Sequence, residues 1–268
     1  MLWIGTSGYS YADWKGLYYP TGIKQADLLS FYAEEFDAVE LNYTYYRMPA
    51  ARTLAAMAQK VPAHFRFTLK AHQMMTHERS ASPEMFQEFC TALAPLQAAG
   101  KLGCVLAQFP TSFHYNDQNY AYLRSFRQRM GDIPTVVEFR HRSWVQNAVF
   151  QGLSDLELGF CCVDQPQLAV LIPPVAVATA PIGYIRLHGR NAAKWWQHEQ
   201  AYEIYDYSYT QLELSEWIPK LQKLQQQAQQ VYIFANNCYK SQSITTARHL
   251  KAMLGIQTTE FPVQLSFL

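Results

Sequence analysis

Eight short apolar runs recur along this chain of 268 residues, and helix-like stretches separate most of them. The runs are rich in β-branched or aromatic residues, as is typical of strands buried on both faces of a parallel sheet. Alternating strands and helices favour a closed (β/α)8 barrel of the TIM type. The predicted strands are Trp3–Ser7, Asp37–Asn42, Phe65–Lys70, Gly103–Gln108, Thr135–Arg140, Gly159–Asp164, Gly183–His188 and Val231–Asn236.

Helical patterns fill most of the gaps between these strands. Gln25–Glu35 places its apolar side chains along one stripe. Ser82 and Pro83 begin another helix with an N-cap and a first-turn proline. No linker, repeat or low-complexity tract divides the chain, so we expect one domain over residues 1–268. The remaining predicted helices are Asp117–Met130, Gln211–Gln230 and Ser243–Leu254.

One gap breaks the alternation. Gln165–Ile182 contains four prolines and shows no helical period, so we expect an irregular crossover between the sixth and seventh strands. The alternative fold is an open doubly wound sheet. It is disfavoured because Gly5-Thr-Ser-Gly8 lacks the glycine spacing of a phosphate-binding loop.

Charge and cysteine content limit the class of protein. A net charge of +1 excludes a strongly basic surface, although it leaves room for a local basic cleft. Five cysteines without C-x-x-C spacing favour buried thiols in a reducing compartment. The first strand follows Met1 closely, and no apolar stretch reaches membrane-spanning length. We therefore expect a cytoplasmic protein without a membrane partner, of open oligomeric state.

Pairs of polar side chains end four of the predicted strands. A strand sends alternate side chains to opposite faces, so each of these strands has an apolar face and a face that ends in two polar residues. Active sites of TIM barrels lie where the strands pass into the following loops. The pairs therefore predict one shared site at the mouth of the barrel. They are Glu40 and Asn42, Thr68 and Lys70, Glu138 and Arg140, and Arg186 and His188.

Four of these residues are candidates for catalysis. Glu40 and Glu138 suit a general acid and base, provided that a neighbouring cation holds one of them ionised. Lys70 suits the role of that neighbouring cation, or it could form a Schiff base if it is desolvated. His188 suits a proton shuttle or a hydrogen-bond donor.

Cations outnumber carboxylates among the strand ends, which favours an anionic ligand such as a phosphate or a carboxylate. Aromatic residues follow the first two strands, and the long loop from Gly189 to Tyr209 suits a lid. The alternative is that the buried ion pairs only stabilise the barrel. The candidate substrate-binding residues are Tyr9, Asn42, Tyr46, Gln108, Arg140, Trp144, Asp164, Arg186, Arg190, Asn236 and Asn237.

A metal site is the less favoured interpretation of the same residues. Glu40, Glu138, Asp164 and His188 are similar to the oxygen-rich sets that hold Mg²⁺ or Mn²⁺. The lysine and arginines of the same mouth disfavour a bound cation. We therefore predict no metal and no cofactor, with a divalent metal as the minor alternative.

Several sequence motifs, in the order in which they occur, also resemble those of a known family. The chain resembles the YecE-like family, a domain-of-unknown-function family with series number 72, nearly from end to end. The resemblance implies a TIM-type barrel and implies no particular chemistry. Its motifs are Gly5-Thr-Ser-Gly-Tyr-Ser-Tyr-Ala-Asp-Trp-Lys-Gly16, Val39-Glu-Leu-Asn-Tyr-Thr-Tyr-Tyr-Arg-Met-Pro49, Phe65-Arg-Phe-Thr-Leu-Lys-Ala71, Gln108-Phe-Pro110, Val137-Glu-Phe-Arg-His-Arg-Ser-Trp144, Arg186-Leu-His-Gly-Arg190 and Phe234-Ala-Asn-Asn237.

Two functions remain open from the sequence. The first is an enzyme, a hydrolase or a lyase, that acts on a phosphorylated or otherwise anionic substrate at the barrel mouth. The second is non-catalytic binding of a nucleotide or of single-stranded nucleic acid by the same cations and aromatic loops. Substrate and reaction are not specified by the residues.

Overall fold

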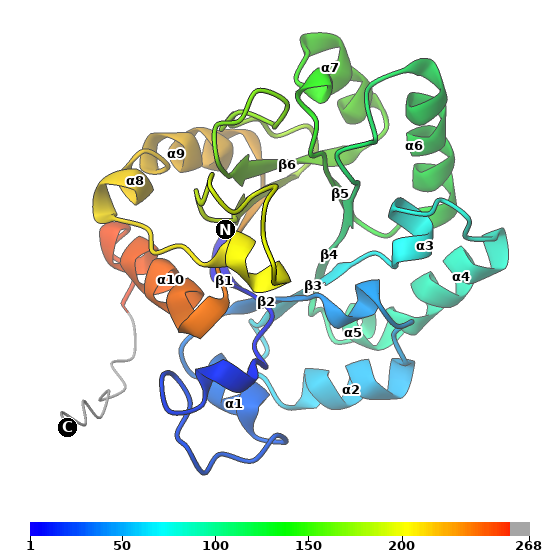
Figure 1. Ribbon diagram of the computed structural model, residues 1–268. Coiled ribbons are helices and arrows are strands. Elements are labelled where there is room, and N and C mark those ends of the chain that lie inside the picture. The colour runs from blue at the N-terminus through cyan, green and yellow to red at the C-terminus, as the bar shows by residue number, and fades with distance from the viewer. Residues whose placement is uncertain (258–268) are drawn as a thin grey trace.

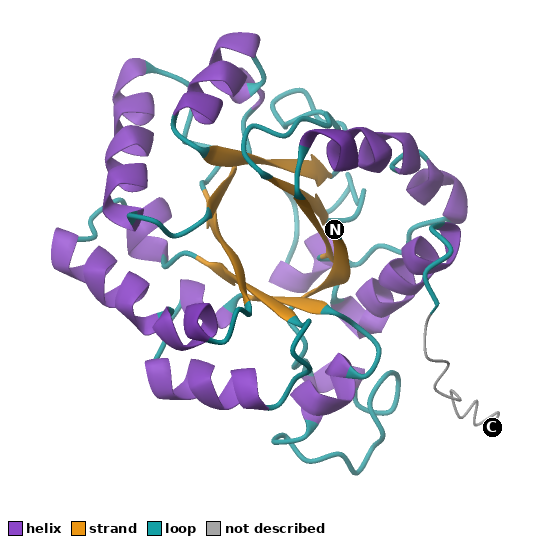
Figure 2. Cartoon of the chain, turned by 180° about the vertical axis from the view of Figure 1, so that it is seen from behind, coloured by secondary structure: helices purple, strands orange, loops and turns teal. Residues whose placement is uncertain are grey.

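The computed structural model describes residues 1–257, so residues 258–268 of the predicted domain lie outside the described part. Eight parallel strands form a closed barrel in chain order, with helices around the outside (Figures 1 and 2). The predicted TIM-type fold is confirmed. The strands are β1 Leu2–Ser7, β2 Ala38–Leu41, β3 Arg66–Lys70, β4 Leu102–Gln108, β5 Thr135–Glu138, β6 Leu158–Asp164, β7 Ile182–Leu187 and β8 Gln230–Ala235.

The helices cover the barrel, and short 3-10 turns (η) follow several strands. The helix predicted over Gln211–Gln230 is two helices, because Pro219 cannot continue the first one. The described helices are α1 Leu28–Ala33, α2 Ala51–Gln59, α3 Gln73–Thr76, α4 Pro83–Ala92, α5 Ala94–Ala98, α6 Asp117–Met130, α7 Asn147–Asp155, α8 Gln211–Ser215, α9 Ile218–Gln227 and α10 Gln242–Met253; the turns are η1 Ala12–Trp14, η2 Tyr43–Tyr45, η3 Arg142–Trp144, η4 Ala201–Tyr205 and η5 Tyr239–Ser241.

The connection between β6 and β7 contains neither a helix nor a strand, as the prolines predicted. Side chains hold this irregular crossover instead. Gln165 Nε2 donates to the carbonyl of Ile172 at 3.1 Å, and Thr179 Oγ1 donates to the carbonyl of Leu158 at 2.6 Å. The crossover thus returns the chain to β7 in the parallel direction that the barrel requires.

Aromatic rings fill the lower part of the barrel interior. Trp3 stacks on Tyr232 with ring centroids 5.1 Å apart, and Tyr232 lies 6.2 Å from Tyr184. Space for the Tyr232 ring comes from Gly103, where an added Cβ would meet that ring at 2.9 Å. Further along the same strand faces, toward the carboxyl ends, the inward side chains become polar. The aromatic layer is therefore the floor beneath the predicted site.

Within residues 1–257, every helix is too short or too polar to cross a lipid bilayer.

Candidate active site at the mouth of the barrel

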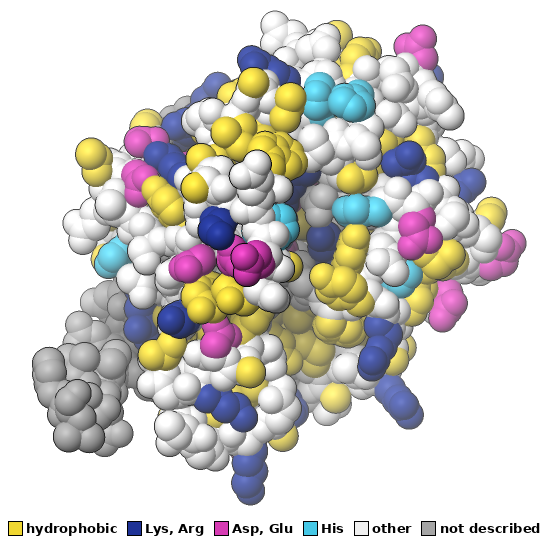
Figure 3. Space-filling view, in the orientation of Figure 1, with side chains coloured by type: hydrophobic (Ala, Val, Ile, Leu, Met, Phe, Trp, Pro, Cys, Tyr) yellow, Lys and Arg dark blue, Asp and Glu magenta, His cyan; other side chains and the backbone are white. Residues whose placement is uncertain are grey.

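A cavity of about 790 Å³ opens at the carboxyl ends of the strands. The loop between β7 and α8 crosses this face of the barrel (Figure 1), and the surface is hollowed there with Lys or Arg atoms at depth (Figure 3). Cations and aromatic rings dominate the lining. The cations are Lys70, Arg140 and Arg186, and the rings are Tyr9, Tyr11, Tyr43, Tyr45, Tyr46, Tyr202, Tyr205 and Tyr239.

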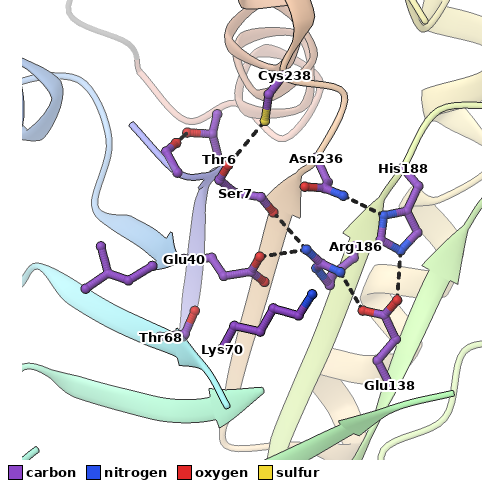
Figure 4. Close-up of polar contacts among 12 residues, drawn as sticks. Thr6, Ser7, Glu40, Thr68, Lys70, Glu138, Arg186, His188, Asn236 and Cys238 are labelled. Atoms are coloured by element: carbon purple, nitrogen blue, oxygen red, sulfur yellow. Dashed lines mark hydrogen bonds and ion pairs between the residues drawn. The ribbon is translucent and has the colours of Figure 1, made fainter. Parts of the chain in front are cut away.

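Arg186 of β7 joins two buried carboxylates beneath the cavity (Figure 4). Its Nη1 lies 2.6 Å from Glu138 Oε2, and its Nη2 lies 2.7 Å from Glu40 Oε1. Nη2 also donates to Ser7 Oγ at 3.4 Å. The alternation of side chains along the strands places these residues on the inner face of the barrel. Because the charges are buried, removing one partner would leave the other charge without compensation.

The second oxygen of Glu40 is also occupied. Tyr184 donates its hydroxyl to Glu40 Oε2 at 2.7 Å, and that hydroxyl lies 2.9 Å from Thr68 Oγ1. Tyr184 was absent from the predicted site, although it shares the inward parity of Arg186 and His188 on β7. Both oxygens of Glu40 thus have protein partners, and its side chain has no exposed surface.

Glu138 Oε1 faces two groups. Arg140 Nε lies 2.6 Å away as an ion pair whose N–H direction does not meet hydrogen-bond geometry, and His188 Nε2 lies 3.1 Å away. Burial alone would raise the pKa of Glu138, but the charges of Arg140 and Arg186, with the hydrogen bond from His188, hold it well below its usual value. Burial, reinforced by Arg140, lowers the pKa of His188 to about 3. Glu138 is therefore ionised and His188 neutral near pH 7.

Lys70 is the cation of the cavity without a carboxylate partner. Within residues 1–257 its Nζ has no hydrogen bond and no ion pair, and it lies 4.2 Å from the ring centroid of Tyr45. Burial, with help from Arg186, lowers the pKa of Lys70 to about 7. The charges of Arg140 and Arg186 balance those of Glu138 and Glu40, so within this buried network a protonated Lys70 adds one positive charge; the carboxylate of Asp13 lines the same cavity.

The loop over the mouth carries part of the lining. Tyr202 and Tyr205 belong to η4 in this loop, and Tyr202 stacks on Tyr239 with centroids 4.5 Å apart. The sequence analysis singled out this loop, whereas Tyr239 was not predicted because it follows β8 in a turn without a distinctive motif. These rings place the lid within contact distance of the β8 end.

Most of the predicted site residues come together here. Those in the buried network or at the cavity surface are Glu40, Lys70, Glu138, Arg140, Arg186, His188 and Asn236, and those in the aromatic wall or beside it are Tyr9, Asn42 and Tyr46.

Asp164 and Arg190, which the sequence predicted as substrate-binding residues, are not among the residues that line this cavity. Arg190 forms a bidentate ion pair with Asp164, at 2.9 Å from Nε to Oδ1 and 2.7 Å from Nη2 to Oδ2. Tyr209 OH and Trp217 Nε1 donate to the same carboxylate at 2.6 and 2.7 Å. Asp164 thus anchors both ends of the loop segment over the mouth, with no oxygen left for a ligand.

Gln108, Trp144 and Asn237 are also absent from the cavity lining, although each ends or follows a strand as predicted. Each side chain is buried and donates within the fold. Trp144 additionally stacks on Phe139 with centroids 4.1 Å apart. The acceptors are Phe109 O for Gln108, Phe113 O for Trp144, and Tyr207 O and Thr246 Oγ1 for Asn237.

The oxygen-rich set considered for a metal does not converge. Asp164 is bound to Arg190, and the guanidinium of Arg186 lies between Glu40 and Glu138. No group of three or more His, Cys, Asp or Glu side chains in residues 1–257 has an arrangement suited to a metal ion. The site is instead a cationic and aromatic one.

Comparison with known proteins places this barrel in a family. The family model described as "Protein of unknown function DUF72" matches residues 3–266. The chain belongs to the DUF72 family. The resemblance noted from the sequence motifs is thereby confirmed, and no established activity comes with DUF72 membership.

Named relatives and solved structures align with this DUF72 chain over nearly its whole length. UPF0759 protein YunF of Bacillus subtilis is 34% identical over 274 residues, covering 96% of each chain. A DUF72 protein of Thermotoga maritima, TM1631, has a TM-score of 0.87 at 36% identity, with 95% of this chain and 99% of that chain covered. The DUF72 protein EF0366 of Enterococcus faecalis has a TM-score of 0.85 at 26% identity, with 97% of each covered. These likenesses support the fold and the family.

Proposed function

We propose that this DUF72 protein is an enzyme that acts on an anionic substrate at the barrel mouth, with Lys70 as the reacting group. The observation that carries the proposal is the position of the Lys70 amine. It lines the cavity without any oxygen partner in the described chain, while the nearby carboxylates are bound by arginines. An amine kept free in this way is available to a substrate.

The buried carboxylates suit a supporting role. Glu40 and Glu138 have no exposed surface, and neither lines the cavity. A general acid or base must come within hydrogen-bond reach of the proton that it transfers. Their contacts favour a role in holding Arg186 and Arg140 in place. His188, neutral and bound at both ring nitrogens, likewise suits positioning better than proton transfer.

Amine chemistry favours a lyase over a hydrolase. The neutral Lys70 nitrogen forms a bond to a substrate carbonyl carbon, and the carbonyl oxygen leaves as water once it has taken up two protons. The resulting protonated imine accepts the electron pair of the neighbouring C–C bond as that bond breaks. The other fragment leaves as carbon dioxide, or as an aldehyde once its hydroxyl group has given up a proton; the remaining fragment takes up a proton, and water then releases it from the Lys70 nitrogen. Arg140 and Arg186 line the same cavity and supply positive charge for an anionic group of the substrate.

Reductive trapping tests this proposal. The protein is incubated with sodium cyanoborohydride and each member of a panel of carboxylated or phosphorylated aldehydes and ketones, and the adducts are mapped by mass spectrometry. We expect at least one compound to modify Lys70 selectively, and the Lys70→Met variant to lose that adduct. Lys24→Met, which removes an exposed lysine, is the matched control and keeps the adduct. Absence of a selective Lys70 adduct across the panel would contradict amine catalysis.

The exposed rings at the mouth support a second candidate, which is binding of a nucleotide or of single-stranded nucleic acid. Tyr46, which lines the cavity, is 74% exposed, and Trp196, on the loop between β7 and α8, is 54% exposed; such rings can stack on bases. This function predicts an affinity for oligonucleotides that falls steeply as salt rises. A titration of a fluorescent oligonucleotide at two salt concentrations separates it from the enzyme proposal.

A further inference from the structure

The side chain of Asn236 has one end bound and one end free. It follows β8, lines the cavity and is 9% exposed. Its Nδ2 lies 2.9 Å from His188 Nδ1 (Figure 4). Its Oδ1 has no hydrogen-bond partner in residues 1–257, and Figure 4 shows that oxygen pointing away from His188.

The orientation of this amide follows from the buried network. The Glu138 carboxylate is ionised and accepts a hydrogen bond, so His188 Nε2 must carry the proton at their 3.1 Å contact. Because His188 is neutral, its Nδ1 is an acceptor and needs a donor. The amide nitrogen of Asn236 is that donor, which assigns the two amide atoms by their partners. The chain of contacts from Glu138 through His188 therefore keeps Asn236 Oδ1 available to the cavity as an acceptor.

Tyrosine hydroxyl groups without protein partners in residues 1–257 belong to the lining of the same cavity. Of the eight tyrosines that line the cavity, only Tyr11 donates its hydroxyl to the described protein, to Ser7 O at 2.5 Å. A tyrosine hydroxyl both donates and accepts, so the other seven can each pair with a ligand hydroxyl. The lining carboxylate, Asp13, already accepts the backbone N–H of Lys240 at 2.7 Å. The cavity thus combines cations, flat ring faces and free hydroxyl groups.

We infer that the ligand of this cavity is a polyhydroxylated anion, a sugar acid or a sugar phosphate, with a hydroxyl group that donates to Asn236 Oδ1. The inference rests on the proposed function, since it assigns the anionic group to the same cations. A purely aromatic anion would cover Asn236 Oδ1 without offering it a donor. A site built to pair with a hydroxyl rejects ligands that lack it.

Matched pairs of ligands test the inference by isothermal titration calorimetry. D-gluconate and hexanoate share their charge and carbon number and differ in hydroxyl groups. D-ribose 5-phosphate and pentyl phosphate form the corresponding phosphate pair. We expect the hydroxylated member of one pair to bind about 100-fold more tightly than its partner. The pair that binds identifies the anionic group as carboxylate or phosphate.

Two variants separate the hydroxyl contact from the charge contact. Asn236→Leu should bring the affinity ratio within the binding pair close to one, with the affinity of the hydroxyl-free member unchanged. Lys70→Met should weaken both members alike and leave the ratio intact. If Asn236→Leu fails to fold, Tyr9→Phe and Tyr205→Phe, which remove hydroxyls without protein partners, should each lower the ratio.

Failure of the hydroxyl inference and failure of the anion site would give different binding results. Equal affinity within both pairs would overturn the hydroxyl inference and leave the anion site standing. An Asn236→Leu variant that folds and keeps the full ratio would also overturn it. Absence of binding by all four compounds would remove both the inference and the anion site on which it depends.

Discussion

At the scale of single residues, the mouth of the barrel shows how neighbours decide what an ionisable group can do. Glu138 and Lys70 lie in the same buried region and both pKa values are lowered, which favours the charged form of Glu138 and the neutral form of Lys70. Two arginines keep Glu138 charged, whereas Lys70 has lost water and gained no carboxylate. The first group therefore maintains structure, and the second is free to react.

Glu138→Gln should destabilise the fold strongly. The variant leaves the buried guanidinium of Arg186 with one carboxylate, and Arg140 with none. Loss of one partner from a buried ion pair costs about 3–5 kcal/mol, so urea unfolding should show a decrease of that size. Glu157→Gln, which removes an exposed carboxylate 3.2 Å from Arg127, is the control and should cost less than about 1 kcal/mol. Equal losses in the two variants would contradict the proposed importance of the buried network.

Acid should have a related effect on the wild type. The pKa of Glu138 in the folded protein lies below its usual value of 4.5. The ionised carboxylate therefore stabilises the fold above that pH, and its contribution declines as the pH falls below 4.5. The decrease in the free energy of unfolding between pH 7 and pH 3.5 should be smaller in Glu138→Gln than in the wild type.

Lys70 should react as a neutral amine at unusually low pH. With a pKa of about 7, its labelling by trinitrobenzenesulfonate should rise tenfold per pH unit below pH 7 and level off above it. Mass spectrometry of the labelled peptide gives the rate, and Nα-acetyl-lysine amide in the same tube serves as the reference, with a rate that continues to rise to pH 9. A Lys70 profile that parallels the reference would show that the amine is not desolvated.

At the scale of elements, Asp164 links a strand end to the loop over the cavity. Its carboxylate receives Arg190 and Tyr209 from the two ends of that loop, and Trp217 from the turn between α8 and α9. One buried acceptor at the end of β6 therefore holds both ends of the loop, in addition to the hydrogen bonds that Asn237 and Gln242 make with Tyr207.

Asp164→Ala should loosen the loop while the barrel stays folded. Without the carboxylate, amide hydrogens of residues 189–209 should exchange at least about tenfold faster, because each 1.4 kcal/mol of lost local stability gives a factor of ten. The strands should keep their protection. Asp132→Ala, at an exposed position without a side-chain contact in the described chain, is the control and should leave loop exchange unchanged. Unchanged exchange in Asp164→Ala would show that other contacts hold the loop.

The sequence predicted the elements that have strong local signals. Each strand is an apolar run with polar ends, and α6 has Asn116 as an N-cap that accepts from the Asn119 amide. Helices α2 and α7 were not predicted; they begin after Ala50 and Gln146, and neither of these residues caps its helix with a side-chain hydrogen bond.

Strand parity likewise predicted the inward residues of the site but not their partners. Parity places Glu40, Glu138 and Arg186 on the inner face, and their pairing depends on the stagger between strands far apart in the sequence. Asp164 and Arg190 follow adjacent strands, and they pair with each other instead of joining the cavity. The local sequence does not determine which of these distant residues pair with each other.

At the scale of the whole molecule, close approach between strands is a requirement for closing the barrel. Gly5 of β1 lies opposite Ala38 of β2, and an added Cβ would meet the Ala38 carbonyl oxygen at 1.9 Å. The Tyr32 hydroxyl from α1 bonds to the same carbonyl at 3.0 Å and accepts the Thr6 amide at 2.8 Å. No side chain can be added here without separating the two strands.

Gly5→Ala should therefore destabilise the protein by about 3 kcal/mol, the upper end of the usual range for overpacking. The midpoint of thermal unfolding measures the effect. Gly22→Ala is the matched control, because an added Cβ there would meet nothing within 4 Å. A Gly5→Ala protein as stable as the control would mean that the β1–β2 seam can widen at little cost.

The pairing of Leu2 with Val231 between β1 and β8 also has a consequence for biosynthesis. The outer edge of β1 has no partner until β8 has left the ribosome, which takes tens of seconds at about 5–20 residues per second. An unpaired strand edge is a template for aggregation. The nascent chain must therefore be shielded for almost the whole of its translation, so its yield in cells should depend more on chaperone supply than the stability of the finished barrel would suggest.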